Sequence, residues 1–256
     1  MRFALALLPI LALAACNGGD KSAGGTGGNG AAAVQSSAPV AGAAAPAGKQ
    51  WTDVVEKTKD NGFRQGNPNA PIKLVEYGSR MCPFCAQFGT TGVGPLREKY
   101  IATGKVSYEY RDFLIHGAPD LALALLNQCV PADAFFPTLD QIYAGQEEFE
   151  KKIMALQQTN PQVLDQIQQM PPPQAAAGFA QALGMVDFMK QRGLPEAQAK
   201  ACLADQKQIE TIAKVNADGA NVYNVNSTPT FFINGQKTDV NSWADLEPLL
   251  QKAGAR

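Results

Sequence analysis

The feature that most constrains the fold is a pair of cysteines three positions apart, Cys82 and Cys85, in the stretch SRMCPFCAQF. The residues before it, IKLVEY at 72–77, alternate as a half-buried β-strand does, and residues 85–99 have helical character. A second alternating stretch, KVSYEYRDF, follows after Gly104. Because strand–helix–strand crossovers join parallel strands, this order predicts an α/β fold with the CxxC pair at the N-terminus of the crossover helix.

The following residues, 118 to about 225, are mostly helix formers. Prolines and glycines such as Pro161 and Gly193 divide them into successive helices, because neither residue type continues a helix well. The last of these stretches predicts a single long helix that begins at Glu196 and ends near residues 221–226.

Strand signals return near the C-terminus, in TPTFFINGQKTDV. Its Asn234-Gly235 dipeptide, between two strand-forming runs, predicts a tight hairpin. The next stretch, SWADLEPLLQKAG, predicts a closing helix with Ser242 as its N-cap.

The N-terminus has the order of an export signal: Arg2, a short apolar run at 3–13, then small residues. The apolar run is too short to span a bilayer comfortably. The sequence LAAC resembles the lipobox of bacterial lipoproteins, which implies a signal peptide at residues 1–15 and a lipid-modified Cys16; the alternative is an ordinary signal peptide with a chance cysteine. Residues 16–50 are rich in Gly, Ala, Ser and Pro, so we expect a flexible tether that buries nothing.

The chain has five cysteines, and removal of the lipid-modified one leaves an even number: Cys82, Cys85, Cys129 and Cys202. In an exported protein, an even number suggests two pairs. The 22 Lys and Arg residues are balanced by 23 Asp and Glu residues. This balance gives no electrostatic footprint for a phosphate backbone, so we expect no nucleic-acid partner.

A strand, CPFC on a helix, a second strand, a helical insertion and Thr-Pro before a hairpin together resemble the thioredoxin fold. The motifs VEYGSRMCPFC, YRDF and NSTPTFFINGQ are similar to those of the DsbA-like thiol-disulfide oxidoreductases of bacterial envelopes. The resemblance covers most of residues 66–256. It implies a thioredoxin-like α/β fold with an inserted all-helical domain: residues 51–117 and 216–256 form the two parts of the thioredoxin-like domain, and residues 118–215 form the insertion.

The position of Cys82 at a helix N-terminus predicts a lowered pKa and a nucleophilic thiolate, which Arg80 is expected to help hold. Cys85, one turn inward, is expected to be the buried resolving thiol. The resemblance implies that Glu76 is a buried acid that accepts the Cys85 proton; the alternative is a surface glutamate on an edge strand. The most oxidising relatives often carry a histidine where this chain has Phe84, so the oxidising strength stays open.

The resemblance also implies that Pro229 is a cis-proline that faces the CxxC pair. Thr228 would then present backbone groups to an extended client, with Pro83 and Phe84 completing the client-binding set. We expect the helical insertion to shape a client groove, on a face that the sequence leaves open.

Cys129 and Cys202 fall in two predicted helices and allow three interpretations: a structural disulfide, a second redox pair, or two unpaired thiols. If they are paired, the chain-entropy model assigns roughly 4 kcal/mol of stabilisation to the long loop. A structural zinc site needs four Cys or His ligands, and besides one CxxC the chain offers only His116 and two distant cysteines. We therefore expect no metal and no cofactor.

The function implied is disulfide donation to cysteine-containing exported proteins by a monomer that is lipid-anchored and faces the periplasm. The resemblance implies a quinone-linked membrane partner that reoxidises the pair. One alternative is an isomerase or reductase on the same fold. Another is a lipoprotein that binds an envelope partner and uses its CxxC only as a structural staple.

Overall fold

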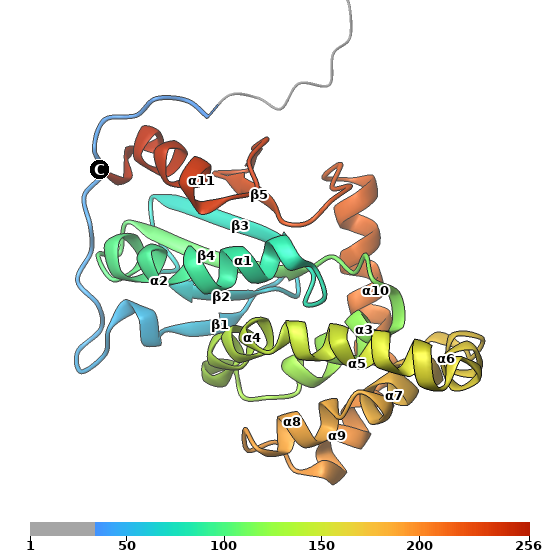
Figure 1. Cartoon of the computed structure of the whole chain (residues 1–256). Helices are drawn as coiled ribbons and strands as arrows, with labels where there is room; N and C mark the ends of the chain where they lie inside the picture. Colours follow the sequence, from blue (N-terminus) through green and yellow to red (C-terminus); the bar gives the residue numbers. More distant parts are fainter. Residues whose placement is uncertain (1–33) are drawn as a thin grey trace, which may run out of the picture. The chain divides into compact units, whose positions relative to one another are not determined.

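The structure is a computed structural model, and it describes residues 34–256; the predicted signal peptide, Cys16 and the first part of the tether lie outside the described residues. A six-stranded mixed sheet with the order β1-β2-β4-β3-β5-β6 forms its centre (Figure 1). Only β3 and β4 pair in parallel, as the crossover rule predicts. The strands are β1 (Val55–Lys57), β2 (Phe63–Gly66), β3 (Ile72–Gly78), β4 (Val106–Asp112), β5 (Thr230–Ile233) and β6 (Gln236–Lys237).

Residues along a strand alternate between the two faces of the sheet, and each face packs against its own cluster of side chains. On one face Leu74 packs in a core with Phe88 of α1 (Pro83–Thr91) and Leu246 of α11 (Trp243–Leu250). Helix α1 continues through α2 (Val93–Leu96) into a π-helical turn, η2 (Arg97–Ile101). On the other face Tyr77 packs with Phe113 in a smaller cluster. The face that carries Leu74 is therefore the one beneath the cysteine pair.

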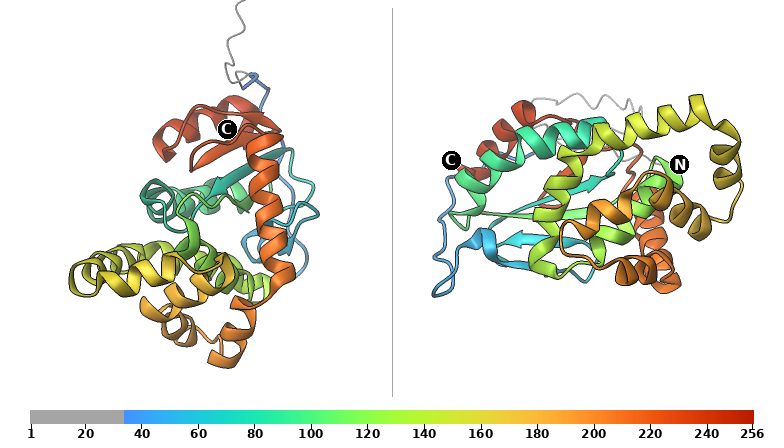
Figure 2. Two further views of the ribbon diagram at one scale, coloured as in Figure 1. Left: turned by 90° about the vertical axis from the view of Figure 1, so that its right-hand side faces the viewer. Right: turned by 60° about the horizontal axis from the view of Figure 1, so that its bottom comes forward.

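The helices between β4 and β5 occupy the region of the predicted insertion (Figure 2). They are α3 (Gly117–Gln128), α4 (Phe135–Ala144), α5 (Gln146–Thr159), α6 (Pro161–Gln168), α7 (Pro172–Ala182), α8 (Met185–Lys190), α9 (Glu196–Leu203) and α10 (Gln206–Asn221). Most of them share a second hydrophobic core, but Phe135, Phe136 and Tyr143 of α4 pack in the same core as Leu74. Short 3₁₀ turns lie at η1 (Trp51–Asp53) and η3 (Ala132–Ala134), and a π turn at η4 (Gln251–Ala255). Helix α10 runs from the other insertion helices back to the sheet, which ties the insertion to the sheet-bearing part.

The prediction of one long helix from Glu196 is wrong, because the helix is interrupted between α9 and α10. Asp205 lies at the break and its carboxylate accepts a hydrogen bond from the backbone N–H of Gln208, 3.0 Å away. Aspartate is a strong N-cap residue, so it starts a new helix here.

The hairpin and the closing helix agree with the sequence. Asn234 and Gly235 both have positive φ angles, 51° and 80°, as a primed hairpin turn requires. Ser242 caps α11, with its hydroxyl accepting a hydrogen bond from the backbone of Asp245.

The segment before η1 lies against the body of the protein. The backbone N–H groups of Ser37 and Val40 donate hydrogen bonds of 2.9 Å to the carbonyls of Lys252 and Gly254, and Val34 is buried. The expectation that residues 16–50 bury nothing is therefore wrong for this part, because backbone groups can anchor a segment whose side chains are small. No helix within residues 34–256 is long and apolar enough to cross a membrane.

Candidate active site

The cysteine pair lies at the start of α1, directly after the central strand β3. Cys82 is the N-cap residue, and Pro83 occupies the first turn, where its missing N–H costs no hydrogen bond. Both cysteines are free thiols. Cys82 retains 3% of its exposed surface, whereas Cys85, one turn further along, is fully buried. Cys82 is thus the sulfur that an outside thiol or disulfide can reach.

The pKa values of the two thiols are shifted in opposite directions. The pKa of Cys82 is lowered to about 5, chiefly by a hydrogen bond from Cys85, with further help from Thr228 and the backbone N–H groups of Cys85 and Phe84; burial opposes this. The pKa of Cys85 is raised well above its usual value, mainly by burial. A thiolate at a helix N-terminus is the state that such N–H groups stabilise. The predicted nucleophile and resolving thiol are thus distinguished by their surroundings.

The loop before β5 closes over Cys82. The Thr228–Pro229 peptide bond is cis, as the resemblance implied, and the Cys82 thiol donates a hydrogen bond to the Thr228 carbonyl oxygen over 3.2 Å. The Thr228 hydroxyl is buried and has no hydrogen-bond partner among residues 34–256. The sequence suggested a role only for the backbone groups of Thr228. Its side chain also contributes to the site, because it lowers the Cys82 pKa.

Glu76 lies beneath the pair on β3, between β4 and β5, so the edge-strand alternative is wrong. Its side chain is fully buried, and burial is the main cause that raises its pKa to about 8. The Tyr108 hydroxyl donates a hydrogen bond to Oε2, whereas Oε1 has no partner in the described part of the chain. The carboxyl group is therefore protonated at neutral pH and has one oxygen free for proton exchange.

Gly78 makes this close arrangement possible. A β-carbon at Gly78 would lie 2.5 Å from the ring of Tyr110 and 2.9 Å from Oε1 of Glu76. Real β-carbons do not approach other atoms so closely, since interiors are already close-packed. The glycine of VEYGSRMC is thus required by its buried neighbours.

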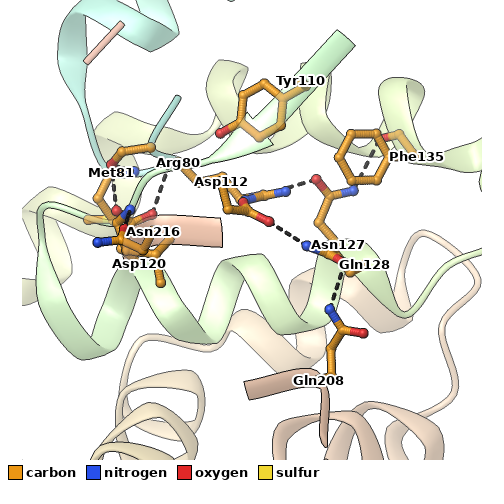
Figure 3. Close-up of polar contacts among 12 residues, drawn as sticks. Arg80, Met81, Tyr110, Asp112, Asp120, Asn127, Gln128, Phe135, Gln208 and Asn216 are labelled. Atoms are coloured by element: carbon orange, nitrogen blue, oxygen red, sulfur yellow. Dashed lines mark hydrogen bonds and ion pairs between the residues drawn. The ribbon is translucent and has the colours of Figure 1, made fainter. Parts of the chain in front are cut away.

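Arg80 does not serve the thiolate in the way that the sequence suggested. Its guanidinium is fully buried, forms an ion pair with Asp112, and donates a hydrogen bond of 3.0 Å from Nε to Asn127 (Figure 3). It also lies over the ring of Tyr110, 5.1 Å from the centroid. The positive charge is therefore compensated by Asp112, and the groups that lower the Cys82 pKa are the hydrogen-bond donors of α1 and Thr228. Arg80 holds the loop that carries Cys82.

Two residues of the insertion complete this support. Asp120, at the start of α3, accepts hydrogen bonds from the Ser79 hydroxyl and from the backbone N–H of Arg80; burial raises its pKa to about 6. Gln146, at the start of α5, donates hydrogen bonds of 2.8 and 3.0 Å to the carbonyls of Arg80 and Cys82. Neither residue lies near the motif in sequence, so nothing in the sequence pattern indicated it.

Comparison with known proteins places this fold and site in a family. The thioredoxin family profile matches residues 58–252. The chain belongs to the thioredoxin family. It is 28% identical over 203 residues to a protein of Rickettsia felis that is provisionally named a protein-disulfide oxidoreductase, a match that spans 78% of this chain and 63% of the other. A similarly named protein of Rickettsia prowazekii is 28% identical over 205 residues, which are 79% of this chain and 65% of that one.

Solved structures agree with the assignment of this chain to the thioredoxin family. A protein-disulfide isomerase from Novosphingobium aromaticivorans superposes with a TM-score of 0.68 at 28% identity, over 73% of this chain and 94% of that one. Alpha-DsbA1 from Wolbachia pipientis has a TM-score of 0.60 at 19% identity, over 76% and 91% of the two chains, and at this identity it supports the fold alone.

Elsewhere in this thioredoxin-family protein, Cys129 and Cys202 form a disulfide that spans 73 residues of the insertion. The interpretation of two unpaired thiols is therefore wrong, and of the two pairs that the even cysteine count suggested, this one is present as a disulfide. Cys129 follows α3 as its C-cap, and Cys202 lies in the last turn of α9. Among the other predicted site residues, Pro83 and Phe84 are exposed beside Cys82, Phe84 by 57%. No group of metal-ligating side chains occurs within residues 34–256.

Proposed function

We propose that this protein is an envelope thiol-disulfide oxidoreductase that donates disulfides to exported proteins. The observation that carries the proposal is the contrast between Cys82, with a pKa of about 5, and the buried Cys85, whose pKa is raised. A stabilised thiolate stabilises the reduced form of the pair, which makes its disulfide a stronger oxidant. The names of the relatives support the same class of reaction.

The reaction follows from the positions of the two sulfurs. A client thiolate attacks Cys82 in the oxidised pair, the Cys82–Cys85 bond breaks, and a mixed disulfide forms between the client and Cys82. A second client thiolate then attacks the client sulfur of this bond, and Cys82 leaves as the thiolate that its surroundings stabilise. The client has lost two electrons, and Cys82 and Cys85 have gained them.

Glu76 supplies the proton for the first of these steps. Cys85 leaves as a thiolate in a buried environment that opposes its charge. The neutral Glu76 carboxyl, with a pKa of about 8, lies beneath the pair and carries a proton at neutral pH. Transfer of that proton to Cys85 removes the buried thiolate charge, and the reverse transfer activates Cys85 when the pair is reoxidised.

The decisive experiment is the equilibrium reduction potential of the Cys82/Cys85 pair, with the state of Cys129 and Cys202 followed separately by mass spectrometry. The two reference points are about −120 mV for DsbA and about −270 mV for thioredoxin, roughly 7 kcal/mol apart. We expect a value near the first. A value near the second would overturn the donor role and indicate a reductase or isomerase.

An isomerase is the second candidate, because the solved structure that is 28% identical is described as a protein-disulfide isomerase. The two activities separate in an assay with scrambled disulfides, where an isomerase restores native pairing in its reduced form. Analytical ultracentrifugation adds a second test: we expect a monomer, and a stable dimer would favour the isomerase.

A binding lipoprotein with a structural CxxC is the third candidate. Free thiols with strongly displaced pKa values argue for chemistry at this pair, because such shifts cluster at functional sites. Fast reaction of the pair with small thiols would support the oxidoreductase, whereas slow or absent reaction would favour the staple.

The membrane anchor is proposed from the sequence. Cys16 carries the lipid, the protein faces the periplasm, and a quinone-linked membrane protein reoxidises the pair. We expect Cys16→Ser to release the protein from the membrane fraction and to abolish incorporation of labelled fatty acid. Retention of both in the variant would contradict lipidation at this residue.

A further inference from the structure

A cavity of about 610 Å³ opens next to the cysteine pair, on the side of the insertion. Met81 and Pro83, the two neighbours of Cys82, line it on one side. Residues at the start of α3 and on α5, α6 and α7 line the rest, including Ile153, Leu164 and Phe179. Its volume is within the range of about 300–1,000 Å³ that is typical of ligand pockets. The cavity thus begins at the two residues that flank the reacting cysteine.

Helix α5 fixes the cavity relative to Cys82. Gln146, Glu150 and Ile153 are spaced four and three residues apart, so they lie on one face of the helix. Gln146 binds the carbonyls of Arg80 and Cys82, while Glu150 and Ile153 line the cavity. The same helical face therefore supports the active-site loop and forms the cavity wall.

The wall is mainly apolar, and its polar side chains are His116, Gln168 and Glu150. Met154 lines the cavity and is 53% exposed, and a methionine side chain adapts to differently shaped partners. Two other glutamates of α5, Glu147 and Glu148, form ion pairs with lysines one turn further along. Glu150 has no ion-pair partner among residues 34–256. A ligand that brings an apolar group and a cation would complement this wall.

We propose that the cavity is a client subsite. It takes an aromatic or aliphatic side chain that lies two to four residues from the reacting cysteine of an extended client, with an adjacent Lys or Arg beside Glu150. An extended chain advances about 3.3 Å per residue, so two to four residues span roughly 7–13 Å, which suits a cavity that begins at Pro83. The proposal rests on the proposed function, and it assigns a client-recognition role to the insertion.

The test uses oxidised full-length protein and a set of reduced dithiol peptides that are identical except near one cysteine. A Phe-Arg peptide is compared with Ser-Arg, Phe-Glu and Ser-Glu peptides by kcat/KM for peptide oxidation. We expect Phe to exceed Ser by about tenfold, because the cavity removes the large apolar side chain of Phe from water. We expect Arg to exceed Glu by about threefold at low salt, with the difference shrinking as salt is added.

Two substitutions on the same helix localise the effect. Glu150→Lys should invert the Arg/Glu preference, whereas the matched control Glu147→Lys, outside the cavity, should keep it. Met154→Gln should reduce the Phe/Ser preference. These ratios are measured within each variant, so a general loss of folded protein does not imitate them.

The outcomes separate the subsite from the proposed function. Equal oxidation of all four peptides by the unaltered protein, or equal changes in Glu150→Lys and Glu147→Lys, would overturn the subsite and leave the oxidoreductase standing. Failure to oxidise any peptide would overturn the oxidoreductase itself. Binding of a small hydrophobic amine that Glu150→Lys abolishes, with unchanged peptide ratios, would also overturn the subsite by identifying a different occupant.

Discussion

The two cysteine pairs occupy opposite ends of helices. Cys82 is the N-cap of α1, where backbone groups of Phe84 and Cys85 help lower its pKa, whereas Cys129 ends α3 and Cys202 lies in the last turn of α9. The positive end of a helix dipole stabilises a thiolate, and the negative end disfavours one. The first pair consists of free thiols above a buried acid, and the second is a disulfide. The comparison predicts that the environment of a pair, rather than its presence, separates a reactive pair from a structural one.

The largest expected effect tests this division directly. Cys82→Ser should abolish peptide oxidation, because serine supplies no thiolate and cannot form a mixed disulfide. The double variant Cys129→Ser/Cys202→Ser should keep turnover at a temperature where it is folded. Both are measured by steady-state oxidation of a dithiol peptide. Turnover in Cys82→Ser, or its loss in the folded double variant, would break the division.

The second prediction concerns stability. Removal of the Cys129–Cys202 disulfide, which spans 73 residues, should cost about 4 kcal/mol of unfolding free energy in the chain-entropy model. For a protein of this size the melting temperature should fall by roughly 8–16 °C. Thermal unfolding of the double serine variant, compared with Cys82→Ser, provides the measurement. An equal, small change in both would show that the insertion disulfide is not a structural one.

The third prediction concerns the acid that only the first pair possesses. Glu76→Gln removes the proton donor for Cys85, so peptide oxidation should slow by roughly 10²-fold, at the low end for general acid catalysis. In the unaltered protein the rate should fall above pH 8, since Glu76 with a pKa of about 8 is then deprotonated. Glu76→Gln should lack this alkaline decline. The exposed Glu56→Gln is the matched control and should keep the normal profile.

A stability measurement distinguishes this role from a packing role. The folded pKa of Glu76 is raised above its usual 4.5 by burial. An acid of this kind binds its proton more tightly in the folded state, so stability is fully present below pH 4.5 and is lost as pH rises through about 8. Relative to the unaltered protein, Glu76→Gln should therefore gain stability with pH across this window. A constant difference at all pH values would contradict a buried titrating carboxyl.

Local pattern predicted the parts of the fold that depend on neighbouring residues: β3, the CPFC start of α1, β4 and the Asn234-Gly235 hairpin. Strands β1 and β2 were missed, because three- and four-residue strands are too short to show alternation. The support of the site was missed for another reason. Tyr108, Asp120 and Gln146 contact it from 32 to 66 positions away in sequence, so only the folded chain brings them to it.

The smallest predicted effect refines the account of the reactive pair. The Thr228 hydroxyl has no partner in the described residues while Cys82 is a thiol, and Thr228 lowers the Cys82 pKa. We infer that the hydroxyl donates to the Cys82 thiolate. Thr228→Val should remove about 1.5 kcal/mol, the contribution of a hydrogen bond to a charged group, and raise the Cys82 pKa by about one unit. Thiolate absorbance during a pH titration measures this shift, with the nearby Thr230→Val as a control.

The same bond should appear in the stability of the reduced relative to the oxidised protein at acid pH, where Cys82 titrates; Cys85, whose pKa is raised, titrates only at alkaline pH. A folded pKa of about 5 lies below the unfolded value near 9, so the stabilisation of the reduced form is fully present above pH 9 and is lost as pH falls through 5. Because Thr228→Val raises the folded pKa of Cys82, the reduced form of this variant should lose its stabilisation at a higher pH than the unaltered protein does. An unchanged Cys82 pKa in Thr228→Val would assign the lowered pKa to Cys85 and the helix N-terminus alone. The difference between Cys82 and the pair Cys129 and Cys202 would then depend on helix position, without a contribution from the cis-proline loop.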